Sequence, residues 1–234
     1  MRPAVVQAGF LGVLLVLCAP ALEARECQGK SDVPLVNLLQ PPPCETCEET
    51  KAEMAELESL ERARTPEQEK HVAADLKRSV ERFLDGGGIA YDAEKLRACD
   101  GFFRKPRQQE KEAVEAAKDA FCRTRPFKTP GNALHPVDEA RPDDSFSHPS
   151  GHAAYGATIG FLLAAMLPEK RAEIYARVND YARSRMIAGV HFRSDVEAGK
   201  LIGAAVAGSF LARPEIRQDF EETKACVRRA VGLD

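Results

Sequence analysis

The sequence has no excess of basic residues. Its 234 residues contain 33 Lys and Arg against 36 Asp and Glu, which gives a formal net charge of −3. A general nucleic-acid binder needs a basic excess to displace counterions from a phosphate backbone, so this class of partner is excluded. Intrinsic disorder is excluded as well, because the hydrophobic fraction of 44% is ordinary and the net charge is small.

The sequence also lacks an apolar run long enough to cross a membrane. After Arg2, the apolar stretch over 4–18 has about fifteen residues, whereas a transmembrane helix needs about twenty. Ala19, Pro20 and Ala21 then supply the small residues that precede a signal-peptidase cut. Residues 1–21 are therefore predicted to be a cleaved secretory signal, with residue 24 as an alternative end.

Secretion determines how the cysteines are interpreted. Cys18 falls within the predicted signal, and six others remain in the mature chain: Cys27, Cys44, Cys47, Cys99, Cys122 and Cys226. An even number of cysteines in an oxidising compartment predicts disulfides, and about fifteen pairings of six cysteines are open. The spacing of Cys44 and Cys47 also fits a redox or zinc pair, but no second pair of metal-ligand spacing accompanies it.

Strict alternation of apolar and polar residues, the pattern of a half-buried strand, is scarce in this sequence. Apolar residues recur at helical spacing over 54–60, 114–121, 174–185 and 214–231. Another helix is expected to start at a capping box of Thr65 and Gln68 and to run until the three glycines at 86–88. The segments 153–167 and 201–212 are apolar on every side, so we expect them to be buried helices.

These patterns predict an all-α fold. Residues 50–234 are expected to form a single-domain helical bundle with buried central helices, preceded by a Pro- and Cys-bearing N-terminal arm at 22–49. Small residues such as Gly160, Gly203 and Gly208 would let the central helices approach closely.

Three blocks hold most of the reactive side chains. Their fixed positions are Lys118 with Arg125 and Pro126, then Pro149, Ser150, Gly151 and His152, then Ser184 and Arg185 with His191 and Asp195. The blocks combine cations, two histidines, one carboxylate and a Ser-Gly turn ahead of a helix. This combination fits the binding of a small anion.

A tetrahedral phosphoryl group needs fixed donors and positive charge around its oxygens. Arg125 and Arg185 can each grip two oxygens, and Lys118 adds a point charge. Ser150 is expected to be the N-cap of the following helix, so that the free backbone N–H groups at Gly151 and beyond form a further anion cradle.

The same blocks supply a nucleophile and an acid. A neutral imidazole can attack phosphorus, and the spacing allows Asp195 to orient His191 for that role. Asp195 is expected in the first turn of a helix that starts at Ser194, with Glu197 completing a capping box. His152 is then the general acid for the leaving group. No metal or other cofactor is expected, since no further cluster has metal-ligand spacing.

The patterns KxxxxxxRP, PSGH and SRxxxxxHxxxD, in this order, resemble the signature of the type 2 phosphatidic acid phosphatase (PAP2) and haloperoxidase superfamily. More narrowly, the chain is similar to the secreted bacterial class A non-specific acid phosphatases. Residues 38–43 resemble the Pro-rich arm of those enzymes, and residues 183–196 resemble their last block. All eleven fixed positions of the three patterns match.

The resemblance implies an all-α, metal-independent acid phosphatase of the periplasm that hydrolyses small phosphate monoesters of broad range and is inhibited by vanadate. It implies a phosphohistidine on His191, protonation of the leaving group by His152, and support of His191 by Asp195. The phosphoryl-binding residues would be Lys118, Arg125, Ser150, Gly151 and Arg185. His148 departs from the pattern, since an aromatic residue is expected there. A homo-oligomer stays open.

Other functions remain as alternatives. A phosphatase without a membrane span could act on lipid-linked phosphates or pyrophosphates at a membrane surface. A vanadium haloperoxidase shares the pocket, but such chains are usually much longer. A non-catalytic phosphate-binding protein would not need a paired nucleophile and acid, and both are present here.

Overall fold

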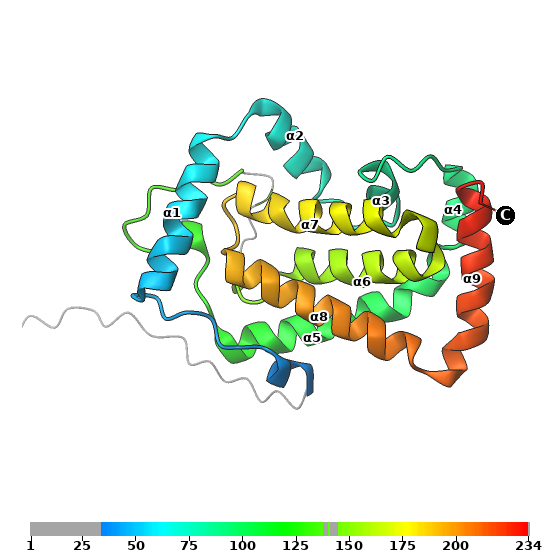
Figure 1. The fold of residues 1–234 in the computed structure, drawn as a ribbon. Helices are drawn as coiled ribbons and strands as arrows, with labels where there is room; N and C mark the ends of the chain where they lie inside the picture. The colour runs from blue at the N-terminus through cyan, green and yellow to red at the C-terminus, as the bar shows by residue number, and fades with distance from the viewer. Residues whose placement is uncertain (1–33, 138–139, 141–144, 234) are drawn as a thin grey trace, which may run out of the picture.

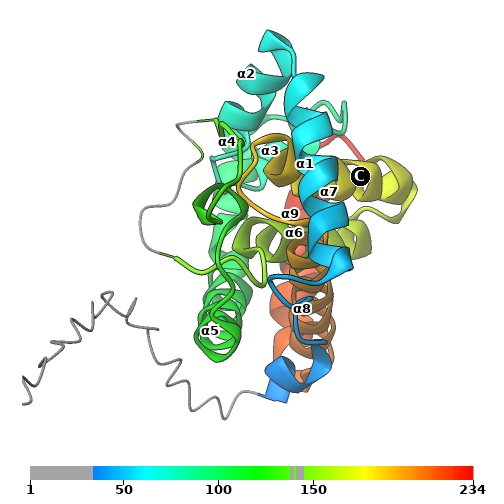
Figure 2. The same ribbon diagram turned by 90° about the vertical axis from the view of Figure 1, so that its left-hand side faces the viewer.

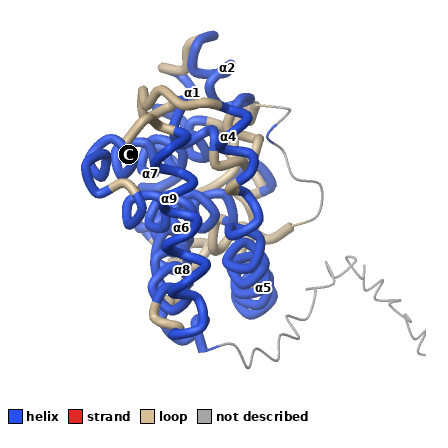
Figure 3. Tube along the Cα trace, turned by 90° about the vertical axis from the view of Figure 1, so that its right-hand side faces the viewer, coloured by secondary structure: helices blue, strands red, loops and turns tan. Residues whose placement is uncertain are grey.

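The computed structural model describes residues 34–137, 140 and 145–233. Throughout these residues the regular structure is helical, and Figure 3 shows no strand in them. The predicted all-α class is therefore confirmed. The predicted signal at 1–21, its alternative end at 24, Cys18 and Cys27 lie outside the described residues.

The described part of the chain forms a series of α-helices joined by short 3-10 turns and loops. The α-helices are α1 (Glu48–Arg62), α2 (Pro66–Ala74), α3 (Glu81–Asp85), α4 (Ala93–Ala98), α5 (Arg104–Phe121), α6 (Gly151–Met166), α7 (Arg171–Ile187), α8 (Arg193–Leu211) and α9 (Arg217–Ala230).

Helix α6 is the centre of the bundle. It lies between α7 and α8 in Figure 1 and also packs against α5, while α9 crosses one end of these helices. Every residue of α6 except His152, Phe161 and Ala165 is buried. A helix that is apolar on all sides lowers its free energy by packing against partners all around, which confirms the expectation for this segment.

Glycines set the spacing of the central helices. A Cβ at Gly203 of α8 would collide with the carbonyl oxygen of Ala154 in α6, and a Cβ at Gly160 of α6 would collide with Val178 of α7. The predicted close approach is confirmed at these two positions. It is wrong for Gly208, where an added Cβ would meet no described atom within 4 Å.

The helix expected from Thr65 to the glycines at 86–88 is broken in two. Its capping box is present, since the Gln68 backbone N–H donates to the Thr65 hydroxyl at 3.3 Å. However, α2 ends at Ala74, and the chain turns before α3. Asp75 is fully buried at this break and accepts hydrogen bonds from two arginines, so the turn gives a buried carboxylate its partners.

Two disulfides that lie wholly within the described residues confirm the prediction of disulfides for four of the six cysteines. Cys99 at the end of α4 is bonded to Cys226 in α9, and Cys44 is bonded to Cys47 in the arm that precedes α1. Leu39, also in this arm, is buried in a cluster with Val114 and other residues of α5, α6 and α8.

One end of the bundle gathers four helix termini. Helices α6 and α8 begin there, and α5 and α7 finish there (Figure 1). Figure 2 views this end and shows α1 running across it. The starts of α6 and α8 are tied together, because the backbone N–H of Ser150 donates to the carbonyl oxygen of Asp195 at 2.9 Å.

Candidate active site

The first and third sequence blocks meet at His191, just before α8. Nη1 of Arg125 lies 3.1 Å from Nε2 of His191. Because a guanidinium only donates, Nε2 is the acceptor, and the proton of the neutral ring lies on Nδ1. Nδ1 faces Oδ2 of Asp195 at 3.5 Å, the outer limit of a hydrogen bond. This tautomer leaves the lone pair on Nε2, the nitrogen that faces the cation.

Asp195 is a fully buried carboxylate with partners on both oxygens. Oδ1 accepts a hydrogen bond from Arg123 at 2.8 Å and lies 3.3 Å from Nδ1 of His148. Oδ2 accepts from the Ser147 hydroxyl at 2.5 Å and from the backbone N–H of Phe192 at 2.9 Å. These contacts fix the carboxylate beside the His191 ring.

The start of α8 differs from the prediction. The helix begins at Arg193, with Phe192 as its N-cap, instead of at Ser194. Asp195 lies in the first turn as expected, but its own carboxylate accepts the Phe192 N–H, so Glu197 does not complete a capping box with Ser194. A buried carboxylate at this place satisfies a free N–H group and benefits from the helix dipole.

Lys118 and Arg125 converge on Ser145. Lys118 lies in the last turn of α5, and its Nζ donates to the Ser145 hydroxyl at 2.6 Å. Arg125 follows in an extended segment, and its Nε donates to the Ser145 carbonyl oxygen at 2.7 Å while Nη1 donates to the Val190 carbonyl oxygen at 2.8 Å. The two cations thus reach the same side of the site.

Arg185 and His152 complete the cluster from α7 and α6. Arg185 is 1% exposed, and its guanidinium donates to the Ser184 hydroxyl at 3.3 Å and to the Val72 carbonyl oxygen at 3.2 Å. His152 is the second residue of α6, and its Nδ1 lies 3.4 Å from Nη2 of Arg78, in the loop between α2 and α3.

The N-terminus of α6 also points to this region. Ser150 is the N-cap, and its hydroxyl accepts from the backbone N–H of Ala153 at 3.4 Å. A Cβ at Gly151 would lie 3.2 Å from Nη2 of Arg78, closer than most side chains tolerate. Glycine therefore keeps the helix start open beside the arginine, where the helix dipole favours an anion.

The surroundings favour the neutral form of both histidines. Burial, together with the neighbouring Arg125, lowers the pKa of His191 to about 3. Burial, then the charges of Arg185 and Arg78, lower the pKa of His152 well below its usual value. His191 is consequently an uncharged base even in mildly acidic solution.

The carboxylate and the cations keep their charges in such solution. Burial raises the pKa of Asp195, but hydrogen bonds from His148 and His191 and the charge of Arg123 outweigh it and hold that pKa well below its usual value. Burial and the charge of Arg125 lower the pKa of Lys118 to about 8.

The cations of the site share one property. Among the described residues, Lys118, Arg125 and Arg185 form no ion pair, and their hydrogen-bond partners are hydroxyl, carbonyl and imidazole groups. Burying a cation without a counter-ion is costly. Three such cations around one neutral histidine form a site that an external anion would stabilise.

The structure thus gathers all the residues singled out in the sequence at one end of the bundle. It adds others that sequence reasoning missed: Arg78, Glu110, Arg123, Ser145 and Ser147, while His148 had been noted only as a departure. Burial raises the pKa of Glu110, on α5, to about 7. Single arginines and serines in loops carry no motif, so the sequence held no signal for them.

A different cluster has ligand atoms close enough for a metal. In the described part of the chain, His71, Asp75 and Asp180 each offer one atom, within 4.8 Å of one another. Arg177 forms ion pairs with both carboxylates, and Arg82 pairs with Asp75 at 2.6 Å. The guanidinium groups already neutralise the carboxylates, so this cluster is a salt-bridge network.

One known protein family matches the part of the chain that contains most of the site residues. Residues 112–218 match the sequence profile described as the PAP2 superfamily. Over this segment, which is less than half of its length, the chain is similar to the PAP2 superfamily. The matched segment contains the PAP2 motif residues from Lys118 to Asp195, whereas Arg78 lies before it.

Two related proteins match parts of the chain. The "Non-specific acid phosphatase" of Salmonella typhimurium is 36% identical over 117 residues, which are 50% of this chain and 45% of that protein. The "Acid phosphatase" of Zymomonas mobilis is 25% identical over 167 residues, which are 71% of this chain and 62% of that protein. The chain therefore spans about half the length of the Salmonella relative.

One solved structure has a weaker similarity to this chain. It is described as a transmembrane PAP2 type phosphatidylglycerolphosphate phosphatase from Bacillus subtilis. The match covers 75% of this chain and 88% of that one, with 19% identity and a TM-score of 0.48, a likeness too weak to bear on function. In the residues described for the present chain, no helix is both long and apolar enough to cross a membrane.

Proposed function

We propose that this protein is an acid phosphatase that hydrolyses phosphate monoesters through a phosphohistidine on His191, without a metal. The observation that carries the proposal is the set of three cations, Lys118, Arg125 and Arg185, that form no ion pair among the described residues and gather with two buried histidines. A phosphoryl group supplies the negative charge that these cations lack. The names of the two related acid phosphatases support the same activity.

In the proposed first step, the three cations and the N–H groups at the start of α6 bind the non-bridging phosphoryl oxygens. Nε2 of His191 attacks phosphorus, and the bond between phosphorus and the leaving oxygen breaks. His152 donates a proton to that oxygen, so the leaving group departs as an alcohol. Asp195 stabilises the positive charge that develops on His191.

In the second step, a water molecule attacks the phosphohistidine. His152, now neutral, accepts a proton from this water, and the bond between phosphorus and Nε2 of His191 breaks. Inorganic phosphate leaves, and both histidines return to their starting states. The donors that bind the phosphoryl oxygens serve both steps, since each passes through the same trigonal arrangement of oxygens.

The pKa values favour reaction in acid. With a pKa of about 3, His191 stays unprotonated and nucleophilic at mildly acidic pH. His152 must carry a proton to act as an acid, and its lowered pKa confines that protonated form to acidic solution. Activity is therefore expected to fall as the pH rises.

The proposal includes secretion. Residues 1–21 would be removed as a signal, residues 22–49 would form the arm, and residues 50–234 would act in the periplasm. The disulfide that joins Cys99 to Cys226 supports an oxidising compartment, because such bonds are rare in a reducing cytosol.

The test uses the purified full-length protein and p-nitrophenyl phosphate. We expect hydrolysis at mildly acidic pH that EDTA does not affect and vanadate blocks. In His191→Ala, kcat should fall by at least about 10³-fold, because the covalent step is lost. His135→Ala, in which an 85% exposed histidine side chain is removed, is the matched control and should keep full activity.

Acid quenching with a labelled substrate should trap a phosphoenzyme in the wild type and not in His191→Ala. Full activity of His191→Ala would overturn the nucleophile assignment, and loss of turnover with EDTA would overturn the metal-free mechanism. A protein that binds phosphate but forms no labelled intermediate would be a binding protein, not an enzyme of this kind.

A further inference from the structure

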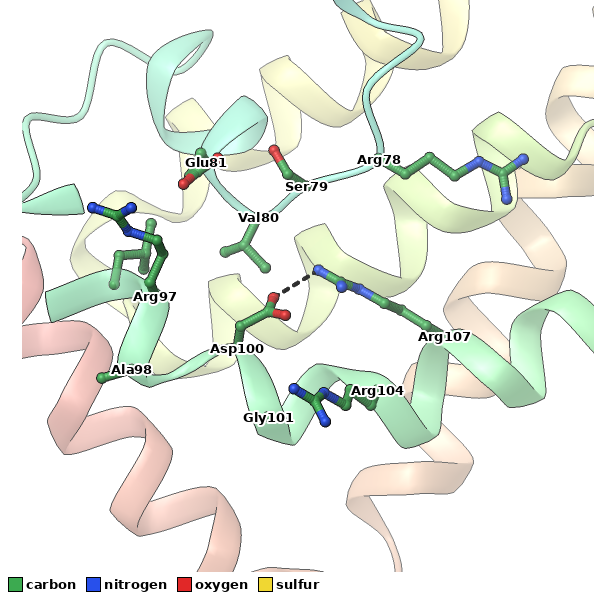
Figure 4. Close-up of a pocket in the computed structure, with 11 residues that line it drawn as sticks. Arg78, Ser79, Val80, Glu81, Arg97, Ala98, Asp100, Gly101, Arg104 and Arg107 are labelled. Carbon is green, nitrogen blue, oxygen red and sulfur yellow. Dashed lines mark hydrogen bonds and ion pairs between the residues drawn. The ribbon is translucent and has the colours of Figure 1, made fainter. Parts of the chain in front are cut away.

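A cavity of about 500 Å³ lies between the loop before α3, the end of α4 and the start of α5 (Figure 4). Its size falls in the range of about 300–1,000 Å³ that is usual for small-molecule sites. Arginines are the most frequent residues in its lining: Arg78, Arg97, Arg104 and Arg107. The acidic residues that line it are Glu81 and Asp100.

The two acids do not neutralise the cavity. Asp100 is paired with Arg107 at 3.0 Å, which Figure 4 marks with a dashed line, and Glu81 is paired with Lys77 at 2.9 Å. Within the described residues, Arg78 and Arg104 form no ion pair. The cavity therefore holds an excess of positive charge in a chain whose formal net charge is −3.

Arg78 connects this cavity with the phosphoryl site. Its Nη2 lies 3.4 Å from Nδ1 of His152. Its guanidinium also lies over the ring of Tyr155 in α6, 5.8 Å from the ring centroid, and the guanidinium of Arg107 lies 5.6 Å from the same centroid. The cavity thus adjoins His152, the proposed acid.

The position of His152 indicates which part of a substrate would enter the cavity. A general acid must lie beside the oxygen that it protonates, so the rest of the leaving group extends on the side of His152. Arg78 contacts His152 and also lines the cavity, and Arg97 lies at the opposite end of the lining in Figure 4. A leaving group that extends past Arg78 would meet guanidinium groups.

We propose that this cavity binds a second anionic group, a phosphate or a carboxylate, carried by the leaving group of the substrate. The inference rests on the proposed phosphatase activity and names a substrate class for it: phosphate monoesters with a second anion beyond the scissile bond. Guanidinium groups suit this role, because each can donate two parallel hydrogen bonds to such an anion. The four arginines precede residue 112, so they lie outside the matched PAP2 segment.

The test compares matched substrates. Alkyl phosphates with a terminal phosphonate, carboxylate or hydroxyl group are prepared at several chain lengths, so that each has one hydrolysable phosphate. At the chain length that reaches the cavity, kcat/KM for the phosphonate or the carboxylate should exceed that for the hydroxyl compound by about tenfold. The phosphonate and carboxylate series distinguish the two kinds of anion.

The matched variants separate the cavity from the catalytic groups. Arg97→Gln combined with Arg104→Gln should abolish the preference and leave kcat/KM for the hydroxyl series unchanged. Lys105→Gln removes an exposed cation next to Arg104 that does not line the cavity, and this variant should keep the preference.

The outcomes distinguish failure of the inference from failure of the proposed phosphatase activity. Hydrolysis of the hydroxyl series without any preference for a second anion would overturn the inference and leave the proposed phosphatase activity intact. A preference that persists in the double variant, or disappears in Lys105→Gln, would also overturn the inference. Absence of turnover with every substrate, p-nitrophenyl phosphate included, would overturn both.

Discussion

Two fully buried aspartates have similar neighbours in this molecule but differ in the cations around them. Asp195 at the start of α8 and Asp75 after α2 are both fully buried and both contact arginine and histidine side chains. By composition alone the two clusters look alike. Each could be taken for a catalytic centre or for a structural ion network.

The difference lies in the cations around them. At Asp75, Arg82 and Arg177 pair with its carboxylate, and Arg177 and His71 also contact Asp180. At Asp195, Arg123 is paired in the same way, but Lys118, Arg125 and Arg185 form no ion pair among the described residues. A buried charge does not by itself mark an active site, whereas buried cations without carboxylate partners beside a histidine favour the binding of an anion.

The largest effect should come from removing each carboxylate in turn. Asp195→Asn should lower kcat by about 10³-fold, since His191 loses the charge that stabilises its cationic form. Asp75→Asn should leave kcat within about twofold but lower the free energy of unfolding by about 3 kcal/mol, because it leaves buried arginines uncompensated. Steady-state kinetics and urea denaturation measure the two effects.

Arg123 retains Glu53 at 2.8 Å in the Asp195→Asn protein, so its fold should persist. Circular dichroism checks that the variant is folded before kinetics are compared. If Asp75→Asn lost activity as severely as Asp195→Asn while remaining folded, the distinction between a catalytic and a structural carboxylate would be wrong.

The sequence predicted the helical class and the clustering of the motif residues for physical reasons. A segment that is apolar on every side indicates a buried helix directly, as in α6. The motif residues Lys118, His152, His191 and Asp195 lie at or beside helix ends, and these ends meet because the central helices pack side by side. Their roles as nucleophile, acid and ligands remain predictions.

The features that the sequence could not predict depend on contacts between residues that are far apart in the chain. The break between α2 and α3 depends on a hydrogen bond from Arg177 to Asp75, which lies 102 positions earlier. Arg78 reaches His152 from 74 positions away. Neither pair has a local pattern, and apolar periodicity alone favoured one continuous helix over the break.

A smaller effect should distinguish two buried arginines on the same helix. Arg177 and Arg185 of α7 are both 1% exposed, but only Arg177 is paired with carboxylates. Arg185→Ala should lower kcat/KM by about 10²-fold, because a donor to the phosphoryl oxygens is lost. Arg177→Ala should instead lower the thermal midpoint, with kcat/KM nearly unchanged.

The kinetics use p-nitrophenyl phosphate, and differential scanning fluorimetry gives the midpoints. Arg183→Ala, at an exposed position of α7, controls for changes in the helix itself. Equal losses of kcat/KM in the Arg177 and Arg185 variants would show that pairing with carboxylates does not separate structural from catalytic arginines.

The smallest effect concerns the pH profile. His152 must be protonated to act as the acid, so kcat/KM falls as the pH rises through its pKa. Burial, Arg185 and then Arg78 lower this pKa, since a nearby cation disfavours the protonated ring. Removing the charge of Arg78 therefore raises the pKa and moves the descending limb of the profile to higher pH.

The measurement is kcat/KM for p-nitrophenyl phosphate from about pH 3 to 8 in wild type, Arg78→Gln and Lys77→Gln. Lys77 is a neighbouring cation whose side chain is 65% exposed and paired with Glu81, so its removal should leave the limb in place. A limb that moves to lower pH in Arg78→Gln, or shifts equally in both variants, would show that the group controlling it does not lie beside Arg78. His152 would then lose its assignment as the acid, and the cavity behind Arg78 would no longer lie on the side of the leaving group.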